Sequence, residues 1–167
     1  MSDGKPSEGT FEGYKNGEDV PLFSYGVLAT TFNLLFVLFL LATRVTGRSI
    51  PERMDVKDIA LLGMATHKIS LVGSQDAITS PLRAPFTEIK EKKSPKKVDE
   101  EPRGQGLRRS VGELLTCKFC LGVWMASFFI YGLVLVPRVT RLVAAVFAIV
   151  TVSDYLHQTY KALMERA

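Results

Sequence analysis

The sequence predicts an all-α membrane protein with three transmembrane helices, a C-terminal helical hairpin and a basic cytoplasmic loop, and a fourth transmembrane helix is the alternative. Three observations predict this class. Apolar residues are gathered in long uncharged runs, charged residues lie between those runs, and Lys and Arg are concentrated in one connection. A run of about 20 apolar residues, at ~1.5 Å per residue, matches the ~30 Å hydrocarbon layer of a bilayer.

The first predicted span covers residues 20–43 and follows an acidic polar tail, residues 1–19. No charged residue occurs from Val20 to Thr43, and the centre of the run is almost entirely Leu, Phe and Val. Because a helix satisfies its own backbone hydrogen bonds in lipid, this run is expected to cross the membrane as a helix.

Two further spans are predicted at residues 119–137 and 139–158. The first contains no charge, with Trp124 near its start and Pro137 at its end. The second follows after a short turn, so the two helices form a hairpin, and residues 159–167 are a polar tail. Aromatic side chains near the ends of such spans are favoured at the membrane interface.

The segment 55–72 is ambiguous. Asp55 is placed to cap a helix and Gly73 to end it, and the centre of the segment is apolar. After the capping residue, its titratable residues are Lys57, Asp58, His67 and Lys68. Since charges inside a span are costly unless they face protein or reach the interface, an amphipathic interfacial helix is favoured and a marginal span is the alternative.

Residues 73–118 form the basic loop, with ten Lys and Arg. The positive-inside tendency places this loop in the cytoplasm and predicts a multi-pass protein of the cell membrane. Three spans would put the N-terminus outside, whereas four would put both termini inside. The part from 88 to 102 is charge-rich, contains prolines and lacks aromatic residues, so it is expected to be mobile.

The two cysteines of the chain, Cys117 and Cys120, lie where the loop meets the second predicted span. A closed zinc site needs four ligands, so His67 and Asp76 are the candidates to complete one. Thiol redox chemistry is another alternative, because a helix N-terminus favours thiolate. Reduced cysteines packed as small apolar residues are favoured, because the cytoplasm keeps thiols reduced. The cofactor is therefore unknown, with zinc as the candidate.

Arginines flank the mobile part of the loop. They are Arg83, Arg103, Arg108 and Arg109. Guanidinium groups pair well with carboxylate or phosphate, so these residues are candidates for contact with an anion or a partner. The favoured interpretation is that Asp76 and Arg83 pair with each other or hold the loop on the membrane surface. No nucleic-acid partner is expected, because lysines are mixed with acidic residues and no aromatic side chains interleave for base stacking.

The same loop carries a family resemblance. Its strings are Thr79-Ser80-Pro81-Leu82-Arg83-Ala84-Pro85-Phe86, Glu101-Pro102-Arg103-Gly104-x-Gly106-Leu107-Arg108-Arg109 and Gly112-Glu113-Leu114-Leu115-Thr116-Cys117-x-Phe119-Cys120-Leu121-Gly122-x-Trp124. In these strings the chain resembles the bacterial integral-membrane domain-of-unknown-function family numbered thirteen-sixty, from about Val56 to the C-terminus. The resemblance implies a small membrane protein with no assigned reaction. Members often have Pro between the cysteines, where this chain has Lys118.

No catalytic residues are predicted, and a non-enzymatic role is favoured. The expected function is that of a membrane-anchored scaffold or accessory protein whose cytoplasmic loop contacts a partner protein or lipid. The alternatives are a cytoplasmic-face metal or thiol-redox protein acting through the cysteine pair, and a small transporter subunit. Membrane lipid, a protein partner and a second copy of the chain are the expected partners.

Overall fold

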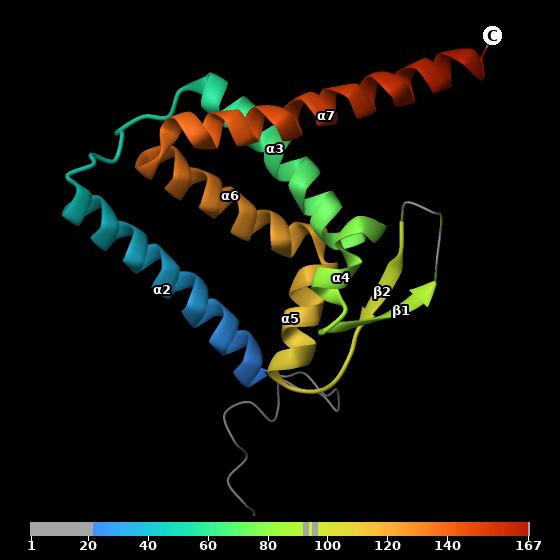
Figure 1. Ribbon diagram of the computed structural model, residues 1–167, viewed down its shortest axis with the longest axis horizontal. Coiled ribbons are helices and arrows are strands. Elements are labelled where there is room, and N and C mark those ends of the chain that lie inside the picture. The colour runs from blue at the N-terminus through green and yellow to red at the C-terminus, as the bar shows by residue number, and fades with distance from the viewer. Residues whose placement is uncertain (1–21, 92–93, 95–96, 167) are drawn as a thin grey trace, which may run out of the picture.

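The computed structural model of the chain describes residues 22–91, 94 and 97–166 (Figure 1). The predicted acidic tail, residues 1–19, lies outside the described residues, as do the first two residues of the predicted first span. Four long helices run through the molecule, and a small mixed substructure lies at one end of them.

Three helices have the length and composition to cross a membrane: α2 (Leu22–Thr46), α6 (Lys118–Leu135) and α7 (Pro137–Met164). Only 11%, 17% and 22% of their most apolar windows are buried inside the protein. A water-soluble bundle would turn such surfaces inward, so these helices face lipid. The predicted fold class is confirmed. Helix α7 continues past residue 158 and includes most of the segment predicted to be a polar tail.

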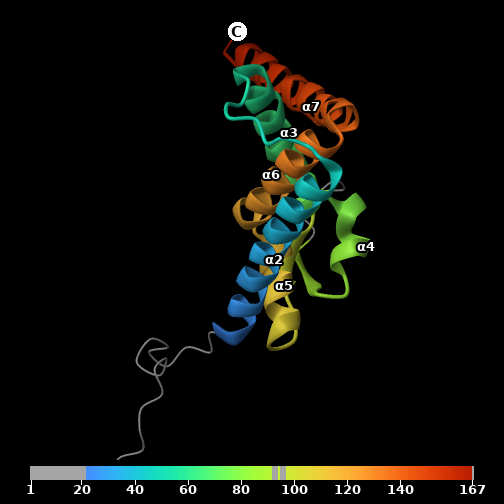
Figure 2. The same cartoon turned by 90° about the vertical axis from the view of Figure 1, so that its left-hand side faces the viewer.

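The ambiguous segment forms helix α3 (Val56–Gln75), which lies against both α6 and α7 (Figures 1 and 2). Asp55 caps it as predicted, because its carboxylate accepts a hydrogen bond of 2.9 Å from the Lys57 amide. The helix continues past Gly73, where the sequence suggested an end. There the absent side chain lets α3 approach α6, since a Cβ on Gly73 would lie 2.8 Å from Leu121 Cδ2.

The charges of α3 are directed at α7. Asp58 accepts two hydrogen bonds from Arg141, of 2.8 and 2.7 Å, and Lys68 forms a 2.7 Å ion pair with Asp154. Both pairs advance along the two sequences together, and α7 crosses α3 obliquely (Figure 1). Two of the charged groups that argued against a span, Asp58 and Lys68, therefore have charged partners on α7.

Helix α2 contacts α6 through aromatic side chains. Phe32 meets Trp124 edge-on with a centroid distance of 5.3 Å, and Phe39 stacks on Tyr131 at 4.5 Å. These pairs also advance together, so α2 and α6 run in the same direction. Helix α3 runs opposite to α6, since Gly73 lies against Leu121 and Ser70 against Gly122, and it is therefore also antiparallel to α2.

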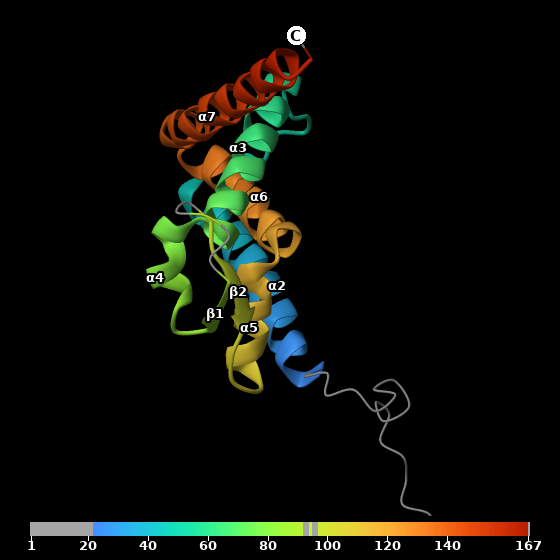
Figure 3. The ribbon, with the colours of Figure 1, turned by 90° about the vertical axis from the view of Figure 1, so that its right-hand side faces the viewer.

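The remaining segment, residues 76–116, is called the platform. It contains η1 (Ala77–Thr79), α4 (Ser80–Arg83), β1 (Thr87–Glu91), β2 (Asp99–Pro102) and α5 (Leu107–Thr116). Strands β1 and β2 pair in antiparallel fashion, α5 packs against β2, and α4 projects to one side (Figure 3). The platform lies at the end of the molecule opposite to the α6–α7 turn.

The hairpin formed by strands β1 and β2, called the β-hairpin, occupies much of the segment 88–102 that was expected to be mobile. Residues 92–93 and 95–96 of that segment lie outside the described residues. On either side of them the strands pair, with Glu88 opposite Glu101 and Thr87 opposite Pro102. Composition suggested mobility because the segment is charged and contains prolines. Thr87 and Glu100 tie the ends of the two strands to Arg83, while the mobility of the segment stays a prediction.

Candidate functional site

Arg83 is the most completely buried charged residue of the described chain, with a side chain only 1% exposed. Its planar fork pairs with Glu100, whose side chain is 3% exposed, through Nε–Oε2 and Nη2–Oε1 distances of 2.9 Å each. Such a bidentate pair fixes both partners in orientation as well as distance. It joins the short helix α4 to strand β2.

The other donors of Arg83 are also satisfied. Nη1 donates to the Gly73 carbonyl at 2.8 Å and to Thr79 Oγ1 at 2.5 Å, and Nη2 donates to the Asp76 carbonyl at 3.1 Å. Gly73 belongs to α3, so the guanidinium connects the platform to the long helices. We call Arg83, Glu100 and these hydrogen-bonding groups the Arg83 latch.

Glu100 completes the latch. Burial by itself raises the pKa of this carboxyl, but hydrogen bonds from Arg83, Ser80 and Thr87, together with the guanidinium charge, outweigh burial and hold the pKa below its usual value. Thr87 Oγ1 donates to Oε2 at 2.6 Å, and the Ser80 hydroxyl donates to Oε1. The carboxylate is therefore ionised at neutral pH, as the buried guanidinium requires.

The latch changes the interpretation of Arg83 and Asp76. The interpretation that they pair through their charges is wrong, because the carboxylate partner of Arg83 is Glu100 and Asp76 contributes its backbone carbonyl. Glu100 was missed as a site residue. It lies inside the acidic run Asp99-Glu100-Glu101, and nothing local distinguishes it from its neighbours.

The other loop arginines do not converge with Arg83 on an anion pocket in the described structure. Arg108 Nε donates to the Pro85 carbonyl at 2.8 Å, and Arg109 forms a 3.1 Å ion pair with Glu113 one helical turn away. Arg103 Nε is buried without a hydrogen-bond partner among the described groups. Contact with an anion or a partner stays a prediction for Arg103, Arg108 and Arg109.

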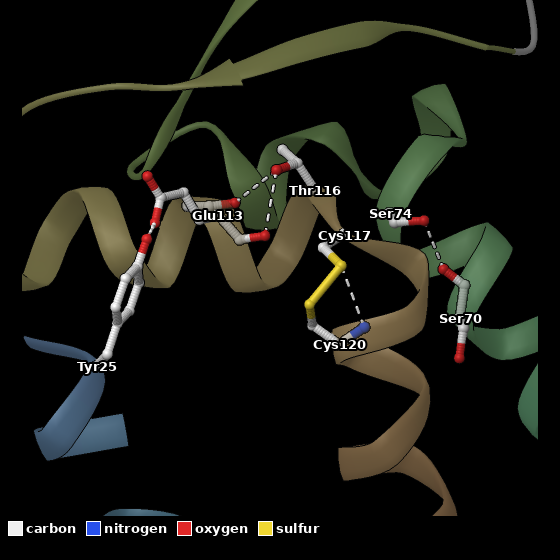
Figure 4. The surroundings of a disulfide bond; sticks show 8 residues. Tyr25, Ser70, Ser74, Glu113, Thr116, Cys117 and Cys120 are labelled. Carbon is white, nitrogen blue, oxygen red and sulfur yellow. Dashed lines mark hydrogen bonds between the residues drawn. A yellow bond between two sulfur atoms is a disulfide. The ribbon is translucent and has the colours of Figure 1, made fainter. Parts of the chain in front are cut away.

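Cys117 and Cys120 are joined by a disulfide at the junction of α5 and α6 (Figure 4). Their Cα atoms are 5.3 Å apart, and Cys117 caps α6 by accepting a 3.2 Å hydrogen bond from the Cys120 amide. The favoured interpretation of reduced, buried thiols is wrong for this structure: the sulfurs are bonded, and Cys120 is exposed. The Cys-x-x-Cys spacing on the first turn of a helix brings the two side chains together.

The proposed metal ligands are not assembled. His67 stacks on Tyr155 of α7 with a centroid distance of 6.2 Å, and a disulfide offers no thiolate to zinc. Within residues 22–91, 94 and 97–166, no three His, Cys, Asp or Glu side chains gather closely enough to hold a metal ion. Zinc binding with Asp76 as a ligand stays a prediction.

Figure 4 also shows how α2 is attached to this junction. The Tyr25 hydroxyl, at the start of α2, donates to the Glu113 carboxylate of α5, and Glu113 also holds Arg109. The first helix is therefore tied to the platform as well as to α6. The sequence offered no signal for this contact, because the two residues are 88 positions apart.

A groove of about 420 Å³ lies beside the disulfide, between α3 and α6. We call it the α3–α6 groove. Its walls include His67 and Ser70 of α3, and Gly122 of α6. The two residues between the cysteines, Lys118 and Phe119, also line it, so the Cys-x-x-Cys turn shapes one end of the groove.

Comparison with known proteins gives a family and a relative. The model of a family described as "Protein of unknown function (DUF1360)" matches residues 61–160, more than half of the chain. A curated relative, named sporulation protein YjcA of Bacillus subtilis (strain 168), is 35% identical over 94 residues, which cover 54% of this chain and 80% of the relative. No solved structure matches. Because the family model matches more than half of its residues, the chain belongs to the DUF1360 family of proteins of unknown function.

Proposed function

We propose that this protein is a membrane-anchored docking protein, in which the long helices hold the platform at one membrane surface and the platform contacts a partner protein or lipid. The Arg83 latch is the observation that carries the proposal. A buried ion pair that ties α4, β2 and α3 together makes the loop a defined surface instead of a flexible connection.

The platform also has apolar side chains available for contact. Ile78 is 83% exposed and Leu82 is 76% exposed, one turn apart on the projecting η1–α4 segment. Exposed apolar groups beside charged ones are typical of surfaces that bind partners. The name of the YjcA relative concerns sporulation, and we extend that setting to this chain as the process in which the partner acts.

Photo-crosslinking tests the docking role. We expect p-benzoylphenylalanine at Leu82, in the full chain in Bacillus subtilis membranes, to give a discrete adduct whose yield falls when Arg83→Met releases α4. A probe at Leu163, exposed near the end of α7, is the matched control and should not give that adduct. Identical adducts from both positions, or none from Leu82, would contradict the proposal.

The same experiment separates docking from a second candidate, thiol redox chemistry, which the Cys117–Cys120 disulfide favours. If the latch holds the docking surface, the yield of the Leu82 adduct should not change in the double variant Cys117→Ser, Cys120→Ser. Loss of the adduct in that double variant, with the protein still folded, would favour the redox candidate.

We further propose that α3 crosses the membrane, giving four spans with both termini and the platform in the cytoplasm. The paired charges along α7 support a crossing, because charges that face protein are tolerated in lipid. Charge distribution supports the orientation. Residues 73–118 carry ten Lys and Arg, against four from Arg44 to Lys57 and two from Arg138 to Arg141 at the opposite end.

Cysteine accessibility distinguishes four spans from three. In a Cys117→Ser, Cys120→Ser background, we expect Arg53→Cys to react with an impermeant maleimide on intact cells. Leu82→Cys should react only after permeabilisation. The residues flank α3, so a helix lying on the surface would leave both on one side. If the cysteines introduced at positions 53 and 82 are equally protected from the impermeant maleimide, the four-span arrangement is excluded.

A further inference from the structure

The α3–α6 groove has a floor of small side chains. Gly63 of α3 and Gly122 of α6 line it, and a Cβ added to Gly122 would lie 3.5 Å from Ser70 Oγ. Ser70 itself donates to the Thr66 carbonyl at 2.7 Å, so its hydroxyl is satisfied within α3. The floor is narrow and largely apolar, which suits a hydrocarbon chain better than a polar solute.

One end of the groove is basic. Lys118 lies there with its Nζ 5.1 Å from the Phe119 ring centroid, and Phe119 is 77% exposed. His67 is the other basic residue of the lining, and no carboxylate contributes to it. Among the described residues, no carboxylate forms an ion pair with Lys118. This end also coincides with the N-terminus of α6, where a helix favours negative charge.

We infer that the α3–α6 groove binds one anionic phospholipid, with its phosphate at Lys118 and an acyl chain lying along Gly122 toward Gly63. From Leu71 to Gly63 the groove follows α3 for about 12 Å, the length of eight residues of helix. The phosphate matches the positive charge at the end of the groove beside the α6 N-terminus, and the acyl chain matches the apolar floor. The inference rests on the proposed crossing of α3, which places the groove in contact with lipid, and is independent of the platform's docking role.

Native mass spectrometry of the full chain tests this site. The probe is a mixed micelle holding phosphatidylglycerol and phosphatidylcholine in equal amounts. We expect one phosphatidylglycerol to be retained in preference to phosphatidylcholine, and Lys118→Gln to reduce that preference about fivefold, the effect of one basic residue near a lipid surface. Lys161→Gln, at an exposed lysine near the end of α7, should leave the preference unchanged.

Filling the groove tests whether an acyl chain lies in it. A Cβ on Gly63 has no other atom within 4 Å, so the side chain of Gly63→Leu starts in open space at the groove and should abolish lipid retention. Gly26→Leu, at an equally open glycine of α2, is the control and should retain the lipid. Excess inorganic phosphate should not displace the lipid.

Three results would overturn the inference: equal retention of the two lipids by the wild type, equal effects of Lys118→Gln and Lys161→Gln, or retention by Gly63→Leu. Displacement by phosphate alone would also overturn it, because the site would then bind an anion without its chain. These outcomes are distinguishable from failure of the four-span proposal, which cysteine accessibility measures without any lipid readout.

Discussion

Arg83→Met is expected to destabilise the platform by about 3–5 kcal/mol, because it leaves the Glu100 carboxylate buried and unpaired. The carboxylate would retain hydrogen bonds from Ser80 and Thr87 but lose both guanidinium contacts. Hydrogen exchange in nanodiscs measures the effect. Amides of residues 80–91 and 97–102 should lose protection, while those of α6 and α7 keep it.

A matched control lies in the same β-hairpin. Lys90 and Glu101 also form an ion pair, but their side chains are 60% and 49% exposed. Solvent-exposed pairs contribute about 0–1 kcal/mol, so Lys90→Met should change protection little. Equal losses in Arg83→Met and Lys90→Met would show that the latch does not hold the platform.

The double variant Arg83→Met, Glu100→Leu separates the cost of an unpaired charge from the worth of the pair. Replacing both members of a buried pair with apolar side chains is often far less destabilising than removing one. We therefore expect the double variant to recover much of the protection lost in Arg83→Met. No recovery would indicate that the hydrogen bonds of Arg83 to Gly73 and Thr79 carry most of the effect.

Gly112→Ala is expected to destabilise the contact between α5 and the β-hairpin by about 1–3 kcal/mol, the usual range for overpacking. An added Cβ would lie 2.5 Å from the Phe86 carbonyl oxygen and 3.1 Å from Pro102 Cα. Both are backbone atoms, so no side-chain rotation can relieve the clash. The thermal midpoint of the detergent-purified protein and exchange at the amides of α5 measure the loss.

Intrinsic helix propensity predicts the opposite sign, because Ala is favoured over Gly in a helix by about 1 kcal/mol. Gly63→Ala is the control: its Cβ would meet nothing within 4 Å, so propensity alone should act and the variant should be as stable as the wild type or more so. If Gly112→Ala and Gly63→Ala behave alike, the close packing of α5 on Phe86 and Pro102 is not a feature of the folded protein.

The membrane helices could be predicted from sequence because their signal is local. A run such as Val20–Thr43 contains its own evidence, since length and the absence of charge decide whether a helix suits lipid. The Asp55 cap was equally local, because a cap contacts an amide two residues away. The end of α3 was not, since Gly73 serves close packing against Leu121 instead of ending the helix.

The candidate site depended on residues that the chain brings together over long distances. Glu100 meets Arg83 across 17 positions, and Arg141 meets Asp58 across 83. Charge composition predicted that the β-hairpin segment is mobile and that the α3 segment is poorly suited to a membrane interior. The structure gives Glu100, Asp58 and Lys68 charged partners, and the cost of burying an ion depends on what faces it. The mobility of the one segment and the membrane crossing of the other stay predictions.

The sequence by itself determined that this is a helical membrane protein, where its apolar helices lie, and that its cysteines stand where the loop meets a span. Tertiary structure alone decided that the loop is a latched platform, that α3 directs its charges at α7, and that a groove with a basic end opens beside the cysteine pair. The reason is physical: apolar run length is a property of adjacent residues, whereas ion pairing and packing are properties of residues that only folding makes neighbours.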